Sequence, residues 1–229
     1  MRRAWITFQL LATVLLVMIL VVVVVLLATS MSKCKKQNAF ARTAVLRVHH
    51  DQCADCPKVG EITYLGNGRW TTLATLIGES SSCFCIDGHK AKLVDMGFAN
   101  SDKFDFAVLE TPDYRPICPV TCCELTLTKL RYEGPSCGED LYWSNEFKCG
   151  TVNKCKVLCV NSNTFTVTTA ANYGNAGAGI FDQCGNLVGM VRCGYKGCES
   201  GKRYWRTECV VLHEGWFVNA GLPGGDSSS

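Results

Sequence analysis

The residues of this sequence that could do chemistry are mainly cysteines, histidines and one glycine-rich turn. The chain holds 16 cysteines but only 4 histidines among its 229 residues. Thiolates and imidazoles bind zinc, and a thiol or a histidine-activated hydroxyl can attack a carbonyl carbon. His50, Cys53 and Cys56 stand at a spacing typical of zinc ligands. Cys83 and Cys85 form a second close pair, so a zinc site at these cysteines is one alternative.

Disulfide bonds are the expected use of most cysteines. All 16 lie within residues 34–229, and this density of about 8% approaches that of disulfide-stabilised scaffolds. Disulfide bonds persist in oxidising compartments. We therefore expect the main body of the chain to be lumenal or extracellular, and we expect no cofactor unless zinc occupies the cysteine pairs.

The stretch Tyr173–Gly179 reads YGNAGAG and is followed by IFDQCGNLVGMV. Glycines allow the backbone to bend sharply and to aim two amides at one point, as in a site that stabilises an oxyanion during acyl transfer. Ala176 lies at the centre of this stretch, and its methyl group cannot attack a carbonyl carbon.

The segments around this turn predict an all-β protein. Short runs rich in β-branched and aromatic residues alternate with Gly, Asn, Asp, Pro or Ser. GNG at 66–68 and CGN at 184–186 predict hairpin turns, and about eleven or twelve strands predict a barrel or sandwich. Trp70, Trp205 and Trp216 are expected to be core or barrel-end aromatics. The expected strands include 41–50, 60–66, 69–78, 89–97, 104–110, 123–132, 154–160, 164–170, 178–182, 186–194 and 206–213.

The glycine-rich turn resembles the nucleophile segment of the trypsin-like serine proteases. Their Gly-Asp-Ser-Gly-Gly-Pro, with a hairpin behind it, is similar to GNAGAGIFDQCGNLVGMVRCGYKGC, where Gly174 and Gly177 match and Ala176 replaces the serine. GNGRWTTLATL is similar to the histidine segment of the family and has Leu76 at the histidine position. DFAVLE is similar to the aspartate segment and has Asp105 at the aspartate position.

The order and spacing of these motifs support the resemblance. Leu76 and Asp105 are 29 residues apart (105 − 76), and Asp105 and Ala176 are 71 apart (176 − 105). Such gaps are similar to those of compact bacterial and viral members. The terminal RYWRTECVVLHEGWF also resembles the last strand and closing tryptophan segment of the family. Over about residues 44–218, the resemblance implies two packed six-stranded antiparallel β-barrels of the chymotrypsin type.

The resemblance also implies that catalysis has been lost. In the family, the serine attacks, the histidine takes its proton, and the aspartate orients the histidine. Leu76 and Ala176 provide neither base nor nucleophile, so we expect no protease activity. Asp105 must then find other hydrogen-bond donors, such as Thr72, Thr75 or backbone amides. The expected role is binding of a protein or peptide partner, as a scaffold, cofactor or decoy.

The expected binding surface follows from the same resemblance. Residues just before the glycine-rich turn would line the former specificity pocket, which is expected to be small and neutral. The resemblance further implies a disulfide from Cys184 to the region Cys118–Cys123. The expected binding residues are Gly174, Asn175, Ala176, Gly177, Thr169, Ala170 and Gly194.

Two other functions stay open. One is a protease with a rearranged active site, in which His49, His50, His89 or His213 supplies the base, or a cysteine supplies the nucleophile. The other is a viral accessory or polyprotein-derived domain with a structural or zinc-bound role, since small viral members of the family share the compact spacing.

The N-terminal residues predict a membrane anchor. After a tail of residues 1–3, residues 4–28 carry no charge. A helix of about 25 residues would be roughly 37 Å long, which is enough to cross a hydrocarbon core of about 30 Å. We expect a single-pass anchor over 4–29 and a basic linker over 30–43. A cleaved secretory signal ending near LLATS is the alternative.

The rest of the chain is expected to form one domain over residues 44–220. Its barrels are expected at about 44–124 and 136–218, joined by a linker near 125–135, with a flexible tail over 221–229. The formal net charge is only +3, and no basic stripe was evident among the aromatic residues. Nucleic acid is therefore not an expected partner.

Overall fold

The structure is a computed structural model that describes most of the globular part of the chain. It describes residues 9, 11–27, 42–49, 58–78, 83–97, 105–117, 125, 127–145, 151–172, 174–199 and 201–217. The chain divides into two compact units, Met1–Lys35 and Lys36–Ser229.

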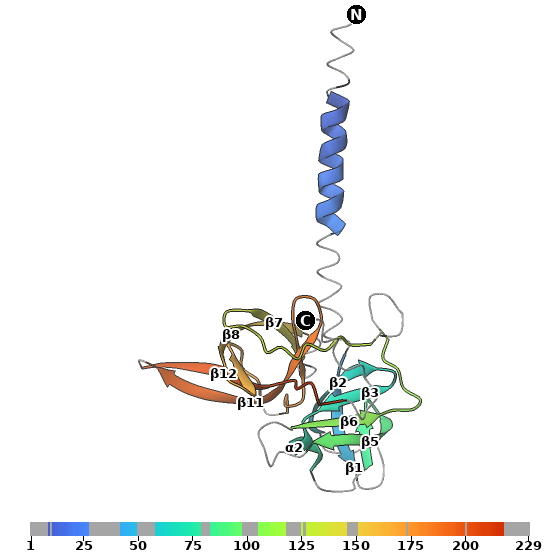
Figure 1. The fold of residues 1–229 in the computed structure, drawn as a ribbon, viewed down its shortest axis with the longest axis vertical. Coiled ribbons are helices and arrows are strands. Elements are labelled where there is room, and N and C mark those ends of the chain that lie inside the picture. Colours follow the sequence, from blue (N-terminus) through green and yellow to red (C-terminus); the bar gives the residue numbers. More distant parts are fainter. Residues whose placement is uncertain are drawn as a thin grey trace, which may run out of the picture. The chain divides into compact units, whose positions relative to one another are not determined.

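The first unit contains a helix whose side chains are exposed. Residues 11–27 are helical, and Figure 1 shows this helix in blue. Across the described residues, no helix is both long enough and apolar enough to cross a membrane. Residues 4–8, 10 and 28–29 of the anchor predicted over 4–29 lie outside the described part.

The second unit contains two closed six-stranded barrels, as predicted. The strand order is β1-β2-β3-β6-β5-β4 in the first barrel and β10-β11-β12-β9-β8-β7 in the second, and neighbouring strands are antiparallel (Figure 1). The elements are β1 Thr43–His49, β2 Lys58–Gly66, β3 Arg69–Thr72, α2 Ala74–Ile77, β4 Cys83–Ile86, β5 His89–Gly97, β6 Phe106–Glu110, β7 Asp140–Asn145, β8 Thr151–Val160, β9 Thr164–Val167, β10 Gly179–Phe181, β11 Leu187–Glu199 and β12 Lys202–Val211.

Both predicted hairpin turns are confirmed. Asn67 and Gly68 join β2 to β3 with φ angles of 53° and 74°, and Gly185 turns between β10 and β11 with a φ of 82°. Positive φ angles suit the tight connection of antiparallel strands. These turns set the register of two hairpins whose strands lead into the candidate site.

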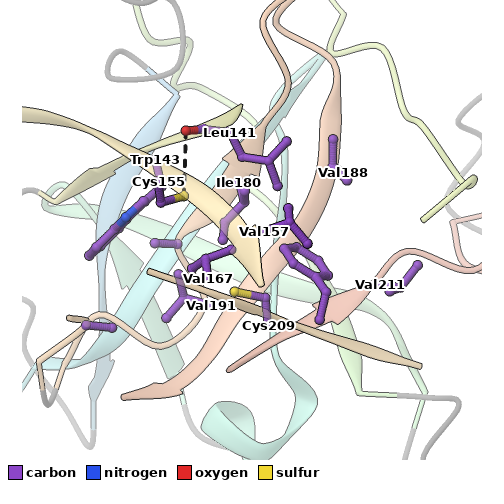
Figure 2. Close-up of a cluster of buried hydrophobic side chains, with 13 residues drawn as sticks. Leu141, Trp143, Cys155, Val157, Val167, Ile180, Val188, Val191, Cys209 and Val211 are labelled. Carbon is purple, nitrogen blue, oxygen red and sulfur yellow. Dashed lines mark hydrogen bonds between the residues drawn. The ribbon is translucent and has the colours of Figure 1, made fainter. Parts of the chain in front are cut away.

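Apolar side chains fill each barrel and the space between the barrels. One cluster inside the first barrel includes Trp70, which is fully buried. Another fills the second barrel (Figure 2). A third joins residues of both barrels, such as Phe106 from β6 and Met190 from β11, and includes Trp216. This shared core holds the two barrels against each other.

Two predicted strands are wrong in part. The run 69–78 ends as a strand at Thr72 and continues as the short helix α2, whose buried residues Ala74 and Ile77 have helical spacing. The run 123–132 is not a strand in its described part, where Leu130 makes only an isolated bridge to Leu187. Its backbone instead connects the barrels, since Thr128 N–H donates to the first barrel and Arg131 N–H to the second.

The cysteines differ from the expectation of several disulfide bonds. Cys85 is disulfide-bonded, whereas seven other described cysteines are free thiols. Cys184 is one of these and is exposed, so the predicted disulfide from Cys184 to the region Cys118–Cys123 is wrong. The buried thiols are Cys155 and Cys209, which lie inside the second barrel (Figure 2).

Candidate functional site

The glycine-rich turn is closed by its own hydrogen bonds. The backbone N–H of Asn175 donates to the Asn172 carbonyl (3.1 Å), and that of Ala178 donates to the Asn175 carbonyl (3.2 Å). The side-chain Oδ1 of Asn175 accepts from the Asn172 N–H at 2.8 Å. Gly174 and Gly177 have φ angles of 94° and 91°, a region in which side chains other than glycine are strained.

Backbone contacts fix this turn between the barrels. The Ala176 carbonyl accepts from the Glu61 N–H of β2 at 2.8 Å, and the Gly177 N–H donates to the Val191 carbonyl of β11 at 2.8 Å. A Cβ atom at Gly177 would overlap the Glu61 carbonyl oxygen and the Thr72 hydroxyl. Glycine is therefore required at 177 both for its backbone angle and for its close approach to β2.

A fully buried side-chain pair reinforces this contact. The Asn175 amide nitrogen donates to Oε1 of Glu61 at 3.1 Å, and neither residue has any exposed surface. Asn175 was expected at the site, whereas Glu61 was missed. The available signal was an acidic residue within GEITYLG, a run that otherwise predicts a buried strand. Because burial of a charge is costly, a glutamate there indicates a specific polar partner.

Leu76 reaches the same place from α2. It packs against the core shared by the two barrels, as does Ala176. A Cβ atom at Gly60 of β2 would lie 2.6 Å from Leu76 Cδ1 and 2.7 Å from the Ala176 carbonyl oxygen. The Leu76 side chain and the Ala176 backbone therefore both contact the backbone of β2 at Gly60.

Asp105 is bound to the residue next to Leu76. It lies just before β6 and is only 5% exposed. Its Oδ1 accepts from the Thr75 N–H at 3.1 Å, and its Oδ2 accepts from the Thr75 hydroxyl at 3.4 Å. Thr75 is one of the donors expected from the sequence, whereas Thr72 donates to the Glu61 carbonyl instead. The carboxylate thus holds the first turn of α2.

The structure therefore brings Leu76, Asp105 and Ala176 to one region, linked through Thr75 and Gly60. The side chains at positions 76 and 176 are hydrocarbon only, so neither has an atom that could take a proton or attack a carbonyl carbon. Among the described residues, the N–H groups of Gly174 and Ala176 donate no hydrogen bond.

The segment before the turn is neutral in its described contacts. The Thr169 hydroxyl accepts from Trp143 Nε1 at 3.1 Å, and the Thr169 carbonyl accepts from the Thr207 hydroxyl at 2.7 Å. Ala170 is exposed. A Cβ atom at Gly194 would overlap the carbonyl oxygen of Ala171, so Gly194 allows β11 to approach this segment closely.

One of the histidines proposed for a relocated base, His89, lies far from this region. His89 begins β5 and stacks on Tyr114, with ring centroids 4.1 Å apart. The other end of β5 is the end near Asp105, since Gly97 pairs with Phe106. At about 3.3 Å per residue, the two ends of this strand are roughly 25 Å apart. His213 lies beside Trp216, and His50 is outside the described residues.

Three thiols of the second barrel, those of Cys155, Cys193 and Cys209, have raised pKa values. Burial raises the pKa of Cys155 to about 12. Burial also raises the pKa of Cys209. The pKa of Cys193 is raised by burial and, in addition, by the negative charge of Glu208. Since the thiolate is the nucleophilic form, these three thiols are poor candidates for a cysteine nucleophile.

The described residues contain no group of three or more histidine, cysteine or acidic side chains placed to hold a metal ion. Cys83 is a free, exposed thiol, but Cys85 is disulfide-bonded and therefore lacks the thiolate that zinc requires. His50, Cys53 and Cys56 lie outside the described part of the chain.

Comparison with known proteins identifies the fold. No family model and no curated protein matches the sequence. Among solved structures, an inactive serine-to-alanine mutant of Rv3671c from M. tuberculosis has a TM-score of 0.52 and 15% identity, over 81% of this chain and 90% of that chain. The human astrovirus serine protease has a TM-score of 0.50 and 15% identity, over 76% and 90%.

A third structure, the HtrA-type protease AlgW, has a TM-score of 0.56 and 17% identity, over 79% of this chain and 64% of that chain. At such identities the likeness concerns the fold, and all three proteins are described as proteases or mutants of them. The paired barrels and these comparisons together lead to one conclusion: this chain has the chymotrypsin-like serine protease fold.

Proposed function

We propose that this protein is a catalytically inactive homologue of the trypsin-like serine proteases and acts by binding a protein or peptide partner. One observation carries the proposal. Leu76 and Ala176 meet at Gly60, next to an Asp105 that is bound to Thr75. The three positions of a catalytic triad are thus adjacent, but two of them hold hydrocarbon side chains. A triad without base and nucleophile cannot perform acyl transfer.

The proposed binding surface consists of the glycine-rich turn, Thr169 and Ala170, and Gly194. Support comes from the amides of Gly174 and Ala176, which donate no hydrogen bond among the described residues. Two amides on one turn suit a carbonyl oxygen of an extended peptide. The neutral contacts of Thr169 favour a small, uncharged side chain of the partner at this point.

Restoring the missing groups tests the loss of catalysis. We expect no reaction of the unmodified full-length chain with a fluorophosphonate probe, because it lacks both the base and the nucleophile. L76H and A176S alone should also not react, because each single variant still lacks one of these two groups. The double variant L76H/A176S should be labelled at position 176. Thermal melts of all four proteins control for folding. Labelling with turnover of the unmodified chain would contradict the proposal.

Capture of a partner tests the binding role. Ala170 is exposed beside the turn, so A170R places a large charged side chain on the proposed surface. S162R makes the same change of charge in the exposed loop between β8 and β9. A partner captured from the native source by the unmodified chain and by S162R, but lost with A170R, would support the surface. Equal capture by both variants would place the binding elsewhere.

The two other functions have less support. The rearranged protease requires a base or thiol that the positions of His89 and the raised thiol pKa values do not favour. The viral accessory or polyprotein-derived domain requires metal only in its zinc-bound form, which the disulfide-bonded Cys85 does not favour; its structural form needs none. Metal analysis of the purified chain, together with non-reducing electrophoresis, separates that function from the binding role.

Membrane attachment through residues 4–29 is a further part of the proposal, and it rests on the sequence. In the described helix over 11–27 the large apolar side chains are exposed, such as Leu16 (70%) and Val22 (52%). We expect the unmodified chain to remain in the membrane pellet at alkaline pH and the variant L16K/V22K to be released. If the body is extracellular, a membrane-impermeant maleimide should label the exposed Cys184 on intact cells.

A further inference from the structure

The hairpin of β11 and β12 extends well beyond the second barrel. The two strands pair out to Glu199 and Lys202. Only the base of the hairpin is joined to other strands, since β10 pairs with β11 no further than Met190 and β9 pairs with β12 from Thr207 onward. Among the described residues, the outer part, residues 195–206, is therefore a two-stranded ribbon with open edges. Figure 1 shows this outer ribbon running away from the barrel.

Exposed aromatic side chains and cations lie together on the outer ribbon. Lys196 Nζ lies 4.5 Å from the centroid of the Trp205 ring, and these two residues are directly opposite each other. Trp205 is 47% exposed and Tyr195 is 38% exposed. The expectation that Trp205 belongs to the core or a barrel end is therefore wrong. Trp and Tyr beside Lys and Arg are typical of protein surfaces that meet the boundary between water and lipid.

The strand register divides the residues of the ribbon between two faces. Lys196 and Trp205 share one face, and Arg203 is two residues from Trp205 along β12. Alternate residues of a strand lie on the same face, so position 203 belongs to the face of Lys196. The acidic residue of the ribbon, Glu199, pairs with Lys202 at a position of the opposite face. The face of Lys196 is therefore basic and aromatic without an acidic residue.

The formal net charge of the chain is concentrated in this ribbon. Residues 195–206 read YKGCESGKRYWR, with four Lys or Arg residues and one Glu, so their charge is 4 − 1 = +3. The whole chain also has a charge of +3, so the rest sums to 3 − 3 = 0. Within the described part of the chain, Lys196 forms no ion pair. The ribbon is thus a local basic surface, and it attracts an anionic partner.

The contacts of the rings disfavour nucleic acid as that partner. The Tyr204 ring lies against Gly197, and the Arg206 guanidinium lies 3.9 Å from the centroid of the same ring. Lys196 lies over the ring of Trp205. Bases of a single strand need open ring faces on which to stack. A lipid interface instead accepts an amphipathic ring together with its neighbouring cations at the level of the headgroups.

The cysteines favour a lipid surface over an extracellular sulfated glycan. Seven described cysteines are free thiols, and Cys85 is disulfide-bonded. A reducing compartment keeps thiols unpaired, and anionic lipids are concentrated in the cytoplasmic leaflet. A ribbon that binds such lipids places the body of the chain in the cytosol, in contrast to the lumenal or extracellular location expected from the cysteine content. Cys184 would then react with an impermeant maleimide only after the cells are permeabilised.

We propose that the outer ribbon of β11 and β12 is a docking element for an anionic lipid surface. Its Lys196 face would lie on the headgroups, with Trp205 at their boundary with the acyl chains. This surface is separate from the proposed site at the glycine-rich turn, and it does not require the anchor predicted over 4–29. If that anchor inserts, the linker over 30–43 spans at most about 50 Å, so lipid stays within reach of the body.

The test uses the full-length chain and vesicles that contain dibrominated phosphatidylcholine, whose bromines quench tryptophan fluorescence at the acyl boundary. One set of vesicles also contains phosphatidylserine. The signal of Trp205 is the difference between the unmodified chain and W205F, so that the other tryptophans cancel. We expect quenching of Trp205 only with phosphatidylserine and its loss at high salt.

Reversal of one charge tests the role of the Lys196 face. Each Lys or Arg near an anionic membrane contributes about fivefold in affinity, or about 1 kcal/mol. K196E removes a positive charge and adds a negative one, so it should lower the ratio of bound to free ribbon about five- to twentyfold. K90E makes the same change on the exposed Lys90 of β5 and should leave the ratio unchanged. Thermal melts of both variants control for folding.

Several results would overturn the proposal: equal quenching of Trp205 with and without phosphatidylserine, quenching that persists at high salt, or equal effects of K90E and K196E. Release of Trp205 from the vesicles by heparin or by a dT20 oligonucleotide, at a lower concentration of negative charge than that of the phosphatidylserine, would overturn it in favour of a soluble polyanion. Sedimentation with vesicles that lack phosphatidylserine reports on the anchor separately, so failure of the anchor and failure of the ribbon are distinguishable.

Discussion

Replacement of Gly177 by alanine tests whether the glycine-rich turn is packed against β2. The new methyl group would overlap the Glu61 carbonyl oxygen and the Thr72 hydroxyl. The backbone φ of +91° adds a strain of about 1–2 kcal/mol for a residue other than glycine. Movement of the turn away from β2 would also break the backbone hydrogen bond between Ala176 and Glu61 and the buried side-chain bond from Asn175 to Glu61, each worth about 1 kcal/mol. We expect a total loss of about 3–5 kcal/mol.

Gly185 provides the matched control. Its φ is +82°, and a Cβ atom there would meet no atom within 4 Å. G185A should therefore show the backbone strain alone, about 1–2 kcal/mol. The measurement is urea unfolding of the full-length chain in detergent, followed by circular dichroism, with thermal melts alongside. In a chain of this size each kcal/mol corresponds to a shift in Tm of about 2–4 °C, so G177A should melt about 10 °C lower.

Equal losses for G177A and G185A would refute this reasoning. The turn would then not be packed against β2, and the closeness of Leu76 and Ala176 at Gly60 would lose its support. A loss for G177A that clearly exceeds the loss for G185A would support the contact on which the proposed function depends.

Three further predictions concern ionisable groups. D105A removes both acceptors used by the first turn of α2 and should cost about 1–2 kcal/mol in the same unfolding assay, whereas an unchanged midpoint would contradict the described contacts. Iodoacetamide at pH 8 should modify the exposed Cys184 and spare Cys155, whose pKa burial raises to about 12; peptide mapping checks this, and equal modification would contradict the burial. Burial opposes ionisation of Glu139, but the hydrogen bond and charge of Arg131 outweigh it and lower the pKa of that carboxyl. The stabilisation is therefore present above the unfolded pKa and lost as the pH falls through the folded pKa, so E139Q should destabilise the protein at pH 7 and have a progressively smaller effect as the pH falls through the folded pKa of Glu139.

Much of the fold could be predicted because its signals are local. Alternation of apolar and polar residues predicts strands wherever one face of a sheet is buried, as in 60–66 and 104–110, which correspond to β2 and β6. The turns at 66–68 and 184–186 were found from glycines that adopt positive φ. The strands alone predicted a barrel or sandwich, and the paired barrels were implied by the resemblance to the trypsin-like proteases, which the order and spacing of the three motifs support.

Errors arose where tertiary contacts outweigh local pattern. The alternation in 123–132 predicts a strand, but its backbone groups bond to both barrels as a connection. Thr75 and its neighbours continue the pattern of β3, but the chain there turns into α2, where Asp105 accepts its hydrogen bonds. Neither partner is near in sequence, so no local pattern could reveal the outcome.

The residues alone determined that positions 76 and 176, which the resemblance aligns with the histidine and serine of the proteases, carry hydrocarbon side chains, because side-chain identity does not depend on folding. Only the tertiary structure decided that Leu76 and Ala176 meet at Gly60, that Glu61 binds Asn175, and that Cys184 is a free thiol. It also decided that Trp205 is exposed on a basic ribbon. The physical reason is that burial, pairing and an open strand edge depend on which distant segments come together. Residues far apart in sequence meet only when the barrels close.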